Sequence, residues 1–446
     1  MDRNKKTLAQ ADNEIFDLVL KETERQNDGL EMIPSENHSS KAVREALGSV
    51  FTDKYSEGYP RKRYYGGNEF VDVAETLAIE RAKKVFGVEH VNVQPYSGSP
   101  ANQAVYFALL EAGDKVMGHN LLDGGHLTHG WKVNFSGKTY HAVQYNVKPD
   151  GYIDLEQARK LALENKPKLI WVGATAYARE FPFEEFGKIA DECGAYLAAD
   201  ISHIAGLVAG GAHKNPVPFV HIVTTTTHKT LRGPRGAMIM VTKKGLQKDP
   251  ELATKIDKAV FPGLQGGPHD HQTAAIAVTL KEAQQPEFRN YAAQIVKNSK
   301  ALAKSLMENG IKLVSNGTDN HLILIDLTSF GKGKGLFAQE ALEVSGITTN
   351  KNTIPADPSS AFYPSGLRLG TPALTTREMK EAQMEQIGKM IARVLKVACT
   401  HDLPEEKEKK EAAIAKAKEE IHNNAELKKI RAEVLELCKK FPLHEK

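Results

Sequence analysis

The sequence predicts an α/β fold with a mainly parallel sheet in a large domain, followed by a smaller α+β domain. The first observation is an alternation of short apolar runs and helical stretches through the middle of the chain, which is typical of β-α-β units. The second is the helical stretch Phe186–Cys193, which Gly194 ends before the apolar run Ala195–Asp200 begins. The third is a change of pattern near residue 285. We therefore expect an N-terminal arm, a large domain and a small C-terminal domain over residues 1–40, 41–285 and 286–446.

Individual elements follow from the same patterns. In the large domain the predicted strands are Val91–Pro95, Lys168–Gly173, Ala195–Asp200, His221–Thr226 and Gly236–Thr242. In the small domain we expect a long helix over Phe288–Asn309 and strands over Lys312–Ser315 and Leu322–Leu327. The amphipathic stretch Ile15–Leu20 predicts an arm or first helix that packs on another surface, for which a second subunit is one option. Residues 404–433 are dense in opposite charges at i,i+4 spacing and favour a solvated helix or hinge.

Composition excludes several classes of function. Lysine and arginine together number 59 and aspartate and glutamate 56, so the net charge of +3 favours neither a nucleic-acid partner nor a membrane surface. No apolar run approaches the ~20 residues that span a bilayer. The first residues lack the apolar core of a signal peptide, and the three cysteines are widely spaced without a CxxC pair. These features predict a cytoplasmic protein.

The segment His221–Gly236 contains the strongest candidate for chemistry. Four threonines favour an extended backbone over Ile222–Thr226, which places Lys229 just past the end of a strand, where open α/β sheets bind ligands. A lysine held there beside another cation has a lowered pKa and is a candidate Schiff-base nucleophile. A solvated loop lysine is the alternative. Asp200, at the end of the preceding predicted strand, favours the first interpretation, because an acid and a lysine at strand ends are what a pyridoxal phosphate site requires.

A phosphate site and a ring-stacking residue are also predicted. Val91–Pro95 runs into Ser97, Gly98 and Ser99, and a helix follows, so free backbone N–H groups and hydroxyls face the start of a helix. An ordinary helix N-cap is the competing interpretation. His126 lies in a segment with three histidines among glycines, where no cysteine or paired carboxylate completes a metal ligand set. We therefore favour His126 as a residue that stacks on a flat cofactor ring.

Two further features suggest substrate binding. Tyr55, Glu57 and Tyr65 belong to a stretch rich in hydroxyls, charges, glycine and proline, which is typical of a binding loop but equally of an ordinary surface loop. Arg368 lies between Leu367 and Leu369, and a buried arginine needs an anion. That anion is either a substrate carboxylate or a structural aspartate.

These residues belong to stretches that closely resemble serine hydroxymethyltransferase over nearly the whole chain. The matching stretches are PSEN (34–37), KYSEGYPRKRYYGG (54–67), NVQPYSGSPAN (92–102), DGGHLTHG (123–130), DISHIAGLVA (200–209), TTTTHKTLRGPRG (224–236), FPGLQGGPHDH (261–271) and SGLRLGTPALTTR (365–377). The resemblance implies a fold-type-I pyridoxal phosphate enzyme, similar to aspartate aminotransferase. It also implies a homodimer with shared active sites, sometimes paired into tetramers, and a reaction of serine with tetrahydrofolate to give glycine and 5,10-methylenetetrahydrofolate, without a metal.

The resemblance implies a role for each matching residue. Lys229 would carry the cofactor as an imine, assisted by His228, while Glu57 and Tyr65 would serve proton transfer. The cofactor would also contact Ser97, Gly98, Ser99, His126, Thr175, Asp200, His203 and Thr226, with Tyr55 and Gly267 contributed by the partner subunit. The substrate amino acid would contact Ser35, Glu57, Tyr65 and Arg368, and the pterin would contact Leu121, Gly125, Leu127 and Asn352.

Some positions depart from the family pattern. Asn120 stands where an acid is usual, His38 where an aromatic residue is preferred, and Glu378 where glycine usually follows TTR. The charged segment 404–422 is longer than the resemblance leads one to expect. None of these departures removes a predicted catalytic group, but they bear on folate affinity and C-terminal packing.

Three other functions compete with the folate-dependent reaction. A folate-independent β-hydroxy-amino-acid aldolase uses the same scaffold, and Glu57, Tyr65 and Asn352 favour the folate reaction over it. A modified pterin carrier in place of folate is a second alternative. A scaffold or RNA-binding relative that has lost catalysis is the third, and the presence of Lys229 and Asp200 argues against it.

Overall fold

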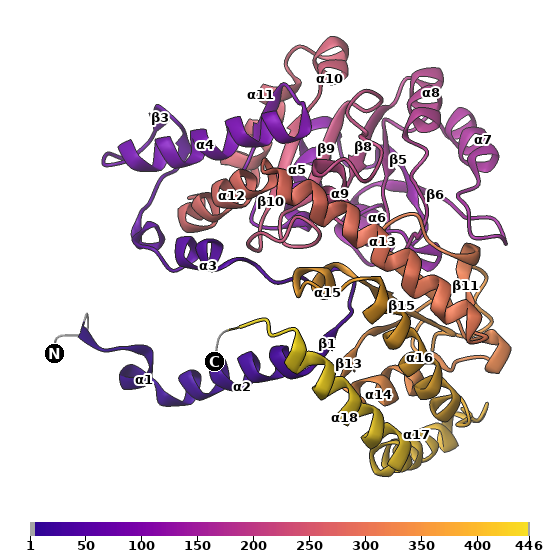
Figure 1. Cartoon of the computed structure of the whole chain (residues 1–446). Coiled ribbons are helices and arrows are strands. Elements are labelled where there is room, and N and C mark those ends of the chain that lie inside the picture. The colour runs from indigo at the N-terminus through magenta and orange to yellow at the C-terminus, as the bar shows by residue number, and fades with distance from the viewer. Residues whose placement is uncertain (1–4, 445–446) are drawn as a thin grey trace.

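The computed structural model describes residues 5–444 and contains two separate main sheets (Figure 1). Residues 1–4, which belong to the expected arm, and residues 445–446, which belong to the expected C-terminal domain, lie outside this description. The larger sheet has seven strands in the order β4-β10-β9-β8-β7-β5-β6. Their bounds are His90–Asn92 (β4), Ala237–Val241 (β10), Ile222–Thr226 (β9), Tyr196–Asp200 (β8), Leu169–Val172 (β7), Lys115–His119 (β5) and His141–Tyr145 (β6).

The prediction of a mainly parallel sheet is confirmed. Strands β9, β8, β7, β5 and β6 pair in parallel, whereas β10 pairs antiparallel with both β9 and β4. All five strands predicted for this sheet are present, each within a few residues of its expected limits. Parallel strands place their carboxyl ends at one edge of a sheet, so the residues that follow β8 and β9 meet there.

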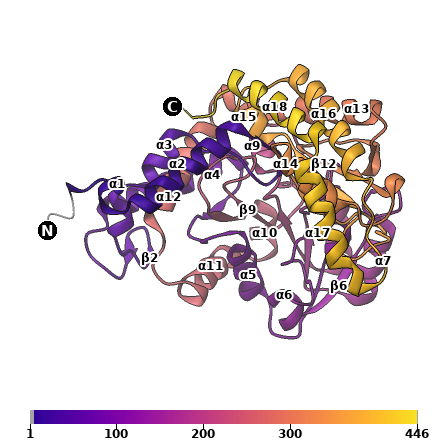
Figure 2. The same ribbon diagram turned by 90° about the horizontal axis from the view of Figure 1, so that it is seen from below.

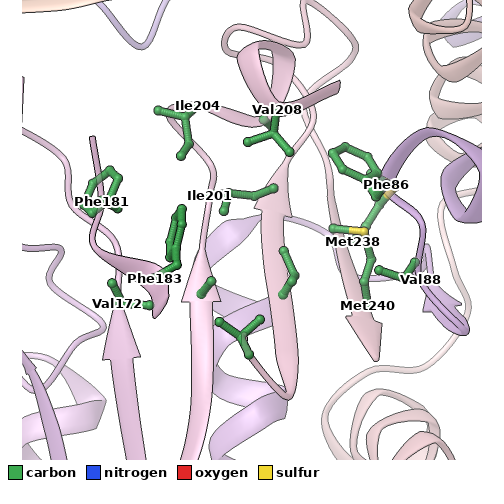
Figure 3. Close-up of a cluster of buried hydrophobic side chains, with 14 of the residues drawn as sticks. Phe86, Val88, Val172, Phe181, Phe183, Ile201, Ile204, Val208, Met238 and Met240 are labelled. Atoms are coloured by element: carbon green, nitrogen blue, oxygen red, sulfur yellow. The ribbon is translucent and has the colours of Figure 1, made fainter. Parts of the chain in front are cut away.

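Helices cover both faces of the large sheet because its strands alternate their buried side chains between two hydrophobic clusters. Leu197 of β8 and Met238 of β10 face the cluster that α4 (Glu69–Phe86) and α8 (Phe183–Cys193) complete. Figure 3 shows part of this cluster, with Phe86 beside Met238 and Phe183 near Ile201. Ala198 and Ile239 face the opposite cluster, which α5 (Gly98–Leu109) and α11 (Leu252–Lys258) cover. As predicted, α8 ends at Gly194, whose φ is +78°.

The C-terminal part has its own antiparallel sheet and hydrophobic cluster. Its strand order is β11-β12-β15-β14, with bounds Lys312–Leu313, Leu322–Asp326, Gly366–Gly370 and Asn350–Asn352. Helices α14 (Gly335–Val344) and α16 (Glu381–Ala398) contribute to that cluster. The predicted long helix is α13 (Pro286–Glu308), and it contributes to the clusters of both sheets. The strand expected over Lys312–Ser315 stops at Leu313, because Ser315 adopts a φ of +56° inside a short 3-10 turn.

The C-terminal residues lie beside the end of α2, where the backbone N–H of His444 donates to Oδ1 of Asn27 at 2.9 Å (Figures 1 and 2). Strand β1 (Leu30–Glu31) pairs in parallel with β13 (Ile347–Thr348), so the N-terminal segment joins the C-terminal part. Buried Arg377 donates hydrogen bonds to the carbonyls of Gly29, Asn27, Phe441 and Cys438. The predicted stretch Ile15–Leu20 is helical within α2 (Asn13–Asp28) and exposes Ile15, Leu18, Val19 and Leu20.

The prediction for residues 404–433 is partly wrong. The segment forms two helices, α17 (Lys407–Asn423) and α18 (Ala425–Lys440), rather than one solvated helix. Helix α18 buries Leu427, Ile430 and Val434, which recur at helical spacing and pack in the C-terminal cluster. The sequence pattern did not reveal these apolar residues of α18, because they follow directly on the charge-dense residues of α17. Within residues 5–444, no helix is long and apolar enough to cross a membrane.

Candidate active site

Lys229 and Asp200 lie at the carboxyl ends of two neighbouring strands, as predicted. Asp200 is the last residue of β8, and its register partner on β9 is Thr224. Lys229 follows the end of β9 by three residues. Both line one small cavity, together with Gly98, His126, His129, Ala174, Thr175, Ser202, His203 and Thr226. The structure thus brings the predicted amine and carboxylate into a single enclosed site.

The environment of Lys229 favours a nucleophilic amine. Burial lowers the pKa of Lys229 to about 8, and the positive charges of Arg368 and Arg235 act in the same direction against the attraction of Asp200. At pH 7 about a tenth of this side chain is therefore uncharged, as an attacking amine must be, against far less than a hundredth at the usual lysine pKa.

Asp200 is held as a carboxylate by a set of donors. Burial acts to raise the pKa of Asp200, but the neighbouring imidazole of His129 and the N–H of Ser202 outweigh it and hold the pKa well below the usual range. The Ser202 N–H donates to Oδ1 at 3.0 Å, and Asn102 Nδ2 donates to Oδ2 at 2.8 Å. His129 Nε2 lies 3.4 Å from Oδ2. A permanent negative charge at this place suits a protonated ring nitrogen.

His126 and His203 are both neutral rings on the wall of the cavity. Burial lowers the pKa of His126 to about 4, and its Nδ1 lies 2.7 Å from the hydroxyl of Thr128. Burial also lowers the pKa of His203 well below its usual value. The Nδ1 of His203 lies 3.2 Å from Nε2 of His321, at the start of β12. An uncharged imidazole such as His126 is suited to stacking on a flat ring.

The start of α5 has the properties of an anion site. Ser97 occupies the N-cap of this helix, and its side chain makes no capping hydrogen bond. Gly98 permits the close approach of β9, because a Cβ there would lie 2.7 Å from Cγ2 of Thr226. The Thr226 hydroxyl is buried without a hydrogen-bond partner among the described residues. Free N–H groups, the helix dipole and unpaired hydroxyls meet where a phosphate would bind.

Arg368 is buried near this site without a carboxylate partner. On β15 it donates from Nε to Oδ1 of Asn350 at 3.1 Å and from Nη1 to the carbonyl of Thr175 at 2.8 Å. Burial lowers the pKa of Arg368 to about 10. Within residues 5–444 no acidic side chain forms an ion pair with it, so the alternative of a structural aspartate fails there. The guanidinium remains available for an anion that arrives from solution.

Ser35 and His228 border a second cavity of about 410 Å³, which Glu36, His38 and Arg235 also line. Burial lowers the pKa of His228 to about 3, and the charges of Arg235 and Lys229 add to this effect. His228 directly precedes Lys229 in sequence, so this cavity lies next to the lysine's segment of the chain, although Lys229 is not among its lining residues.

The residues expected at the pterin come from two segments that meet. Leu121, Gly125 and Leu127 lie in the loop after β5, and Asn352 ends β14. Thr353 donates a hydrogen bond to the carbonyl of Leu122 at 3.0 Å and so joins the two segments. Gly125 admits no side chain, because a Cβ would lie 2.0 Å from the carbonyl oxygen of His119.

The remaining predicted residues form a second cluster that does not line the Lys229 cavity. The Tyr55 hydroxyl donates to Oε1 of Glu57 at 3.3 Å, and the rings of Tyr55 and Tyr65 pack edge to face with centroids 5.3 Å apart. Gly267 lies against Tyr55, since a Cβ on Gly267 would be 3.3 Å from Cζ of that ring. Tyr55 and Tyr65 are both about half exposed, at 56% and 49%.

Four residues of the site were not identified from the sequence. Asn102 and Ser202 bind Asp200, His129 contacts the same carboxylate while it stacks on Trp171, and His321 pairs with His203. Two of them carried a usable signal. His129 follows His126 by three residues in the same glycine-rich stretch, and Asn102 faces the sheet one helical turn after Gly98. His321 is remote in sequence and had none.

The donor set fits pyridoxal phosphate. Thr226 Oγ1 and His203 Nε2 are buried without a partner among the described residues, which leaves unused polar groups around Lys229. An amine of lowered pKa, a buried carboxylate, a neutral ring and an anion site supply one partner for each chemical group of this cofactor. His126, His129 and Asp200 also place one ligand atom each within 4.8 Å of one another. Because Asp200 already accepts hydrogen bonds from Asn102 and Ser202, we assign this trio to the cofactor site.

Comparison with known proteins gives a match to one family over most of the chain. Residues 8–391 match the family model described as "Serine hydroxymethyltransferase". The chain is 53% identical over 436 residues to a serine hydroxymethyltransferase from Acidothermus cellulolyticus, and the match covers 98% of this chain and 96% of the relative. It is 52% identical over 438 residues to a serine hydroxymethyltransferase from Sorangium cellulosum, with the same coverage of 98% and 96%.

Proposed function

The chain belongs to the serine hydroxymethyltransferase family, and we propose that the cavity around Lys229 is its catalytic site. The enzyme reversibly transfers the hydroxymethyl group of serine to tetrahydrofolate, giving glycine and 5,10-methylenetetrahydrofolate, with pyridoxal phosphate as cofactor. The site assignment rests on one observation: Lys229 and Asp200 follow or end adjacent strands and line the same cavity. Arg368 lies nearby, and its hydrogen bonds go to Asn350 and Thr175 rather than to a carboxylate.

We assign a residue or segment of the chain to each main chemical group of the cofactor. Lys229 would hold its aldehyde carbon, Asp200 its ring nitrogen, His126 its ring face, and the start of α5 with Ser97 and Ser99 its phosphate. Thr175, His203 and Thr226 would complete its surroundings. When bound, pyridoxal phosphate supplies an electron sink that allows a bond at the amino acid's α-carbon to break.

The chain's own residues orient the substrate and exclude water. Arg368 would bind the α-carboxylate through its planar fork, and Ser35 would contact the same amino acid from the adjoining cavity. Burial of Arg368 strengthens this contact, because the guanidinium meets little competing solvent. Leu121, Gly125, Leu127 and Asn352 would position the pterin close to the departing one-carbon unit.

Glu57 and Tyr65 would transfer the proton at the substrate hydroxyl. They would do so at the site of a second copy of the chain. In their own subunit they lie with Tyr55 and Gly267, outside the Lys229 cavity, and the two tyrosines are half exposed. We therefore propose a homodimer in which each site combines Lys229 of one protomer with the Tyr55–Glu57–Tyr65 cluster of its partner. Pairing of dimers into tetramers is compatible with this proposal.

The reaction is tested by supplying serine with and without tetrahydrofolate. We expect glycine and 5,10-methylenetetrahydrofolate in equal amounts, and an absorption band near ~420 nm that the Lys229→Ala variant lacks. Serine cleavage at the same rate without folate would instead indicate the aldolase activity. A protein that takes up no pyridoxal phosphate would support the non-catalytic alternative.

Shared sites are tested by mixing two inactive variants. Lys229→Ala and Glu57→Ala each damage both sites of a homodimer, whereas a heterodimer of the two regains one intact site. Random pairing therefore restores about a quarter of the native activity. Lys229→Ala mixed with Asp200→Ala is the matched control, since both changes lie on the same side of the site and no intact site forms. Equal failure of the two mixtures would overturn the dimer proposal and leave the Lys229 assignment standing.

We also propose that the enzyme works in the cytoplasm. Its three cysteines, Cys193, Cys399 and Cys438, are all free, as expected for a reducing compartment. Fractionation of cells that make the native protein would test this placement.

A further inference from the structure

Asn37 contacts the main chain of Lys229 from a segment far away in sequence. It lies in the PSEN stretch between β1 and α3 (Lys41–Leu47), two residues after Ser35. Its side-chain Nδ2 donates a hydrogen bond to the carbonyl oxygen of Lys229 at 3.0 Å and another to the Tyr291 hydroxyl at 2.7 Å. These two bonds use both N–H donors of the amide.

The oxygen of the Asn37 amide is equally committed. Oδ1 accepts a hydrogen bond from the Thr376 hydroxyl at 2.7 Å and one from the backbone N–H of His38 at 2.9 Å. A backbone N–H only donates, so the atom that faces it must be the amide oxygen. The orientation of the amide is therefore determined, and all four of its hydrogen-bonding positions are filled.

The Lys229 carbonyl that Asn37 binds also closes the turn that follows the lysine. The same Lys229 oxygen accepts the N–H of Arg232 at 2.9 Å, which closes a turn over residues 229–232. Arg232 takes a φ of +49°, a conformation that is unfavourable for a residue with a side chain. Its guanidinium lies 4.2 Å above the ring of Tyr291, so the partner of Asn37 also holds the far end of this turn.

The supports of Asn37 come from the C-terminal part of the chain. Tyr291 lies on α13, and its hydroxyl lies 3.4 Å from the carbonyl of Pro372, the first residue of α15 (Pro372–Thr376). Thr376 ends the same helix. Helix α15 directly follows β15, the strand that carries Arg368. One network thus connects the backbone of the lysine with the element that presents the substrate-binding arginine.

We propose that Asn37 is a positioning residue, which holds the backbone of Lys229 in place while the lysine side chain forms and releases its bond to the cofactor. This inference rests on the proposed site. The amine must leave and return to one carbon atom in each cycle, and a displacement of about 1 Å in such a group costs up to a hundredfold in rate. Asn37 provides the restraint without itself touching the reacting atoms.

The Asn37→Asp variant tests the proposal, because it keeps the shape and the acceptor oxygen but loses both donors. Asn298 supplies a matched control. It is a buried asparagine on α13, whose Nδ2 donates to Thr375 Oγ1 at 2.9 Å and to the Met379 carbonyl at 2.8 Å, and whose Oδ1 accepts from Gln294. Asn298→Asp therefore loses the same kind of bonds to α15 and its surroundings without touching Lys229.

Two measurements on the apoprotein separate positioning from a purely structural role. In Asn37→Asp we expect hydrogen exchange at the Arg232 amide to accelerate at least about tenfold, and the rate of pyridoxal phosphate uptake to fall by a similar factor. In the loaded enzyme kcat should fall by about tenfold to a hundredfold, with KM for serine changed by less than about threefold. Asn298→Asp should leave the Arg232 exchange rate and the uptake rate at their native values.

Equal losses of stability in the two variants, with native exchange at Arg232 and native uptake in Asn37→Asp, would overturn the proposal. Tyr291→Phe replaces Asn37→Asp if the latter does not fold, since it removes the hydroxyl that accepts from Asn37. Failure of the proposed site would appear differently. The Lys229→Ala variant would then retain turnover, whereas the exchange measurement on the apoprotein does not depend on turnover.

Discussion

His203 and His321 form a hydrogen bond between two buried imidazole rings, with Nδ1 of His203 3.2 Å from Nε2 of His321. His203 follows β8 beside the Lys229 cavity, whereas His321 immediately precedes β12 of the C-terminal sheet. One ring must donate and the other accept, so both can be hydrogen-bonded only when at least one of them is neutral. Because burial lowers the pKa of both rings, the contact connects the cofactor site to the C-terminal part through uncharged imidazoles.

Acid should weaken this protein partly through His321. Burial lowers the pKa of His321 to about 3, so the folded state resists a proton that the unfolded chain binds near its usual pKa of ~6.5. The stabilising contribution is complete above the unfolded pKa and is lost as the pH falls toward 3. From pH 7 to pH 5 the native protein should lose about 2 kcal/mol through this residue.

The His321→Asn variant should lose correspondingly less over that interval, although it starts from a lower stability. Denaturant unfolding of the apoprotein at the two pH values measures both differences. His141→Asn, at an exposed position of β6, is the control and should show the native loss. An identical acid loss in native protein and His321→Asn would contradict the assignment.

Uptake of pyridoxal phosphate by the apoprotein should depend on the ionisation of Lys229. Because the neutral amine reacts and the pKa of Lys229 is lowered to about 8, the rate should rise about tenfold per pH unit below pH 8 and level off above it. Arg368 is one cause of the lowered pKa, so Arg368→Gln should move the inflection to higher pH.

Stopped-flow absorbance would follow this uptake. Arg393→Gln serves as the control for loss of an arginine, because Arg393 pairs with Glu426 and Glu433 of α18. It should leave the inflection at its native pH. If the pH of the inflection in the uptake rate were unchanged in Arg368→Gln, the charge of Arg368 would not lower the pKa of Lys229 as the structure indicates.

Arg368→Lys should weaken the binding of serine even though the charge is kept. The lysine ammonium cannot reproduce the planar fork that binds a carboxylate through two hydrogen bonds. It also cannot maintain the contacts of Arg368 with both Asn350 and Thr175. Steady-state kinetics should give an increase of at least about tenfold in KM for serine. An unchanged KM, with the protein still folded, would remove Arg368 from the substrate site.

Glu378→Gly should stabilise the protein. Glu378 has a φ of +64° and is exposed, so its backbone is strained in a left-handed conformation and its side chain gains no burial that would offset this strain. This conformation also gives a physical reason for the glycine that the family resemblance leads one to expect at this position. The substitution should add about 1 kcal/mol to the free energy of unfolding. Glu385→Gly, in the exposed interior of α16, should instead subtract about 1 kcal/mol. Denaturant titration of both variants distinguishes backbone strain from a general effect of glycine.

Much of the fold was predictable because it depends on local patterns. The β-branched run before Lys229 and the apolar run before Asp200 both predicted strands, and parallel pairing then required their ends to meet. The burial of α18 and its separation from α17 were not predicted, because its buried residues follow directly on the charge-dense α17. Asn37 likewise carried no local signal of a contact with Lys229, since its partners are 192, 254 and 339 residues away.

Local sequence was enough to identify the chemical groups of this protein, namely the lysine, its acid, the imidazole rings and the arginine, and the family motifs indicated the reaction. These follow from residue type and from spacing along single strands and loops, which are properties of short segments. The tertiary structure alone decided that Arg368 lacks a protein carboxylate, that His203 meets His321, and that Glu57 lies outside the cavity of its own Lys229. Such relationships depend on which distant segments the hydrophobic clusters bring together, and burial then sets the charge of each group.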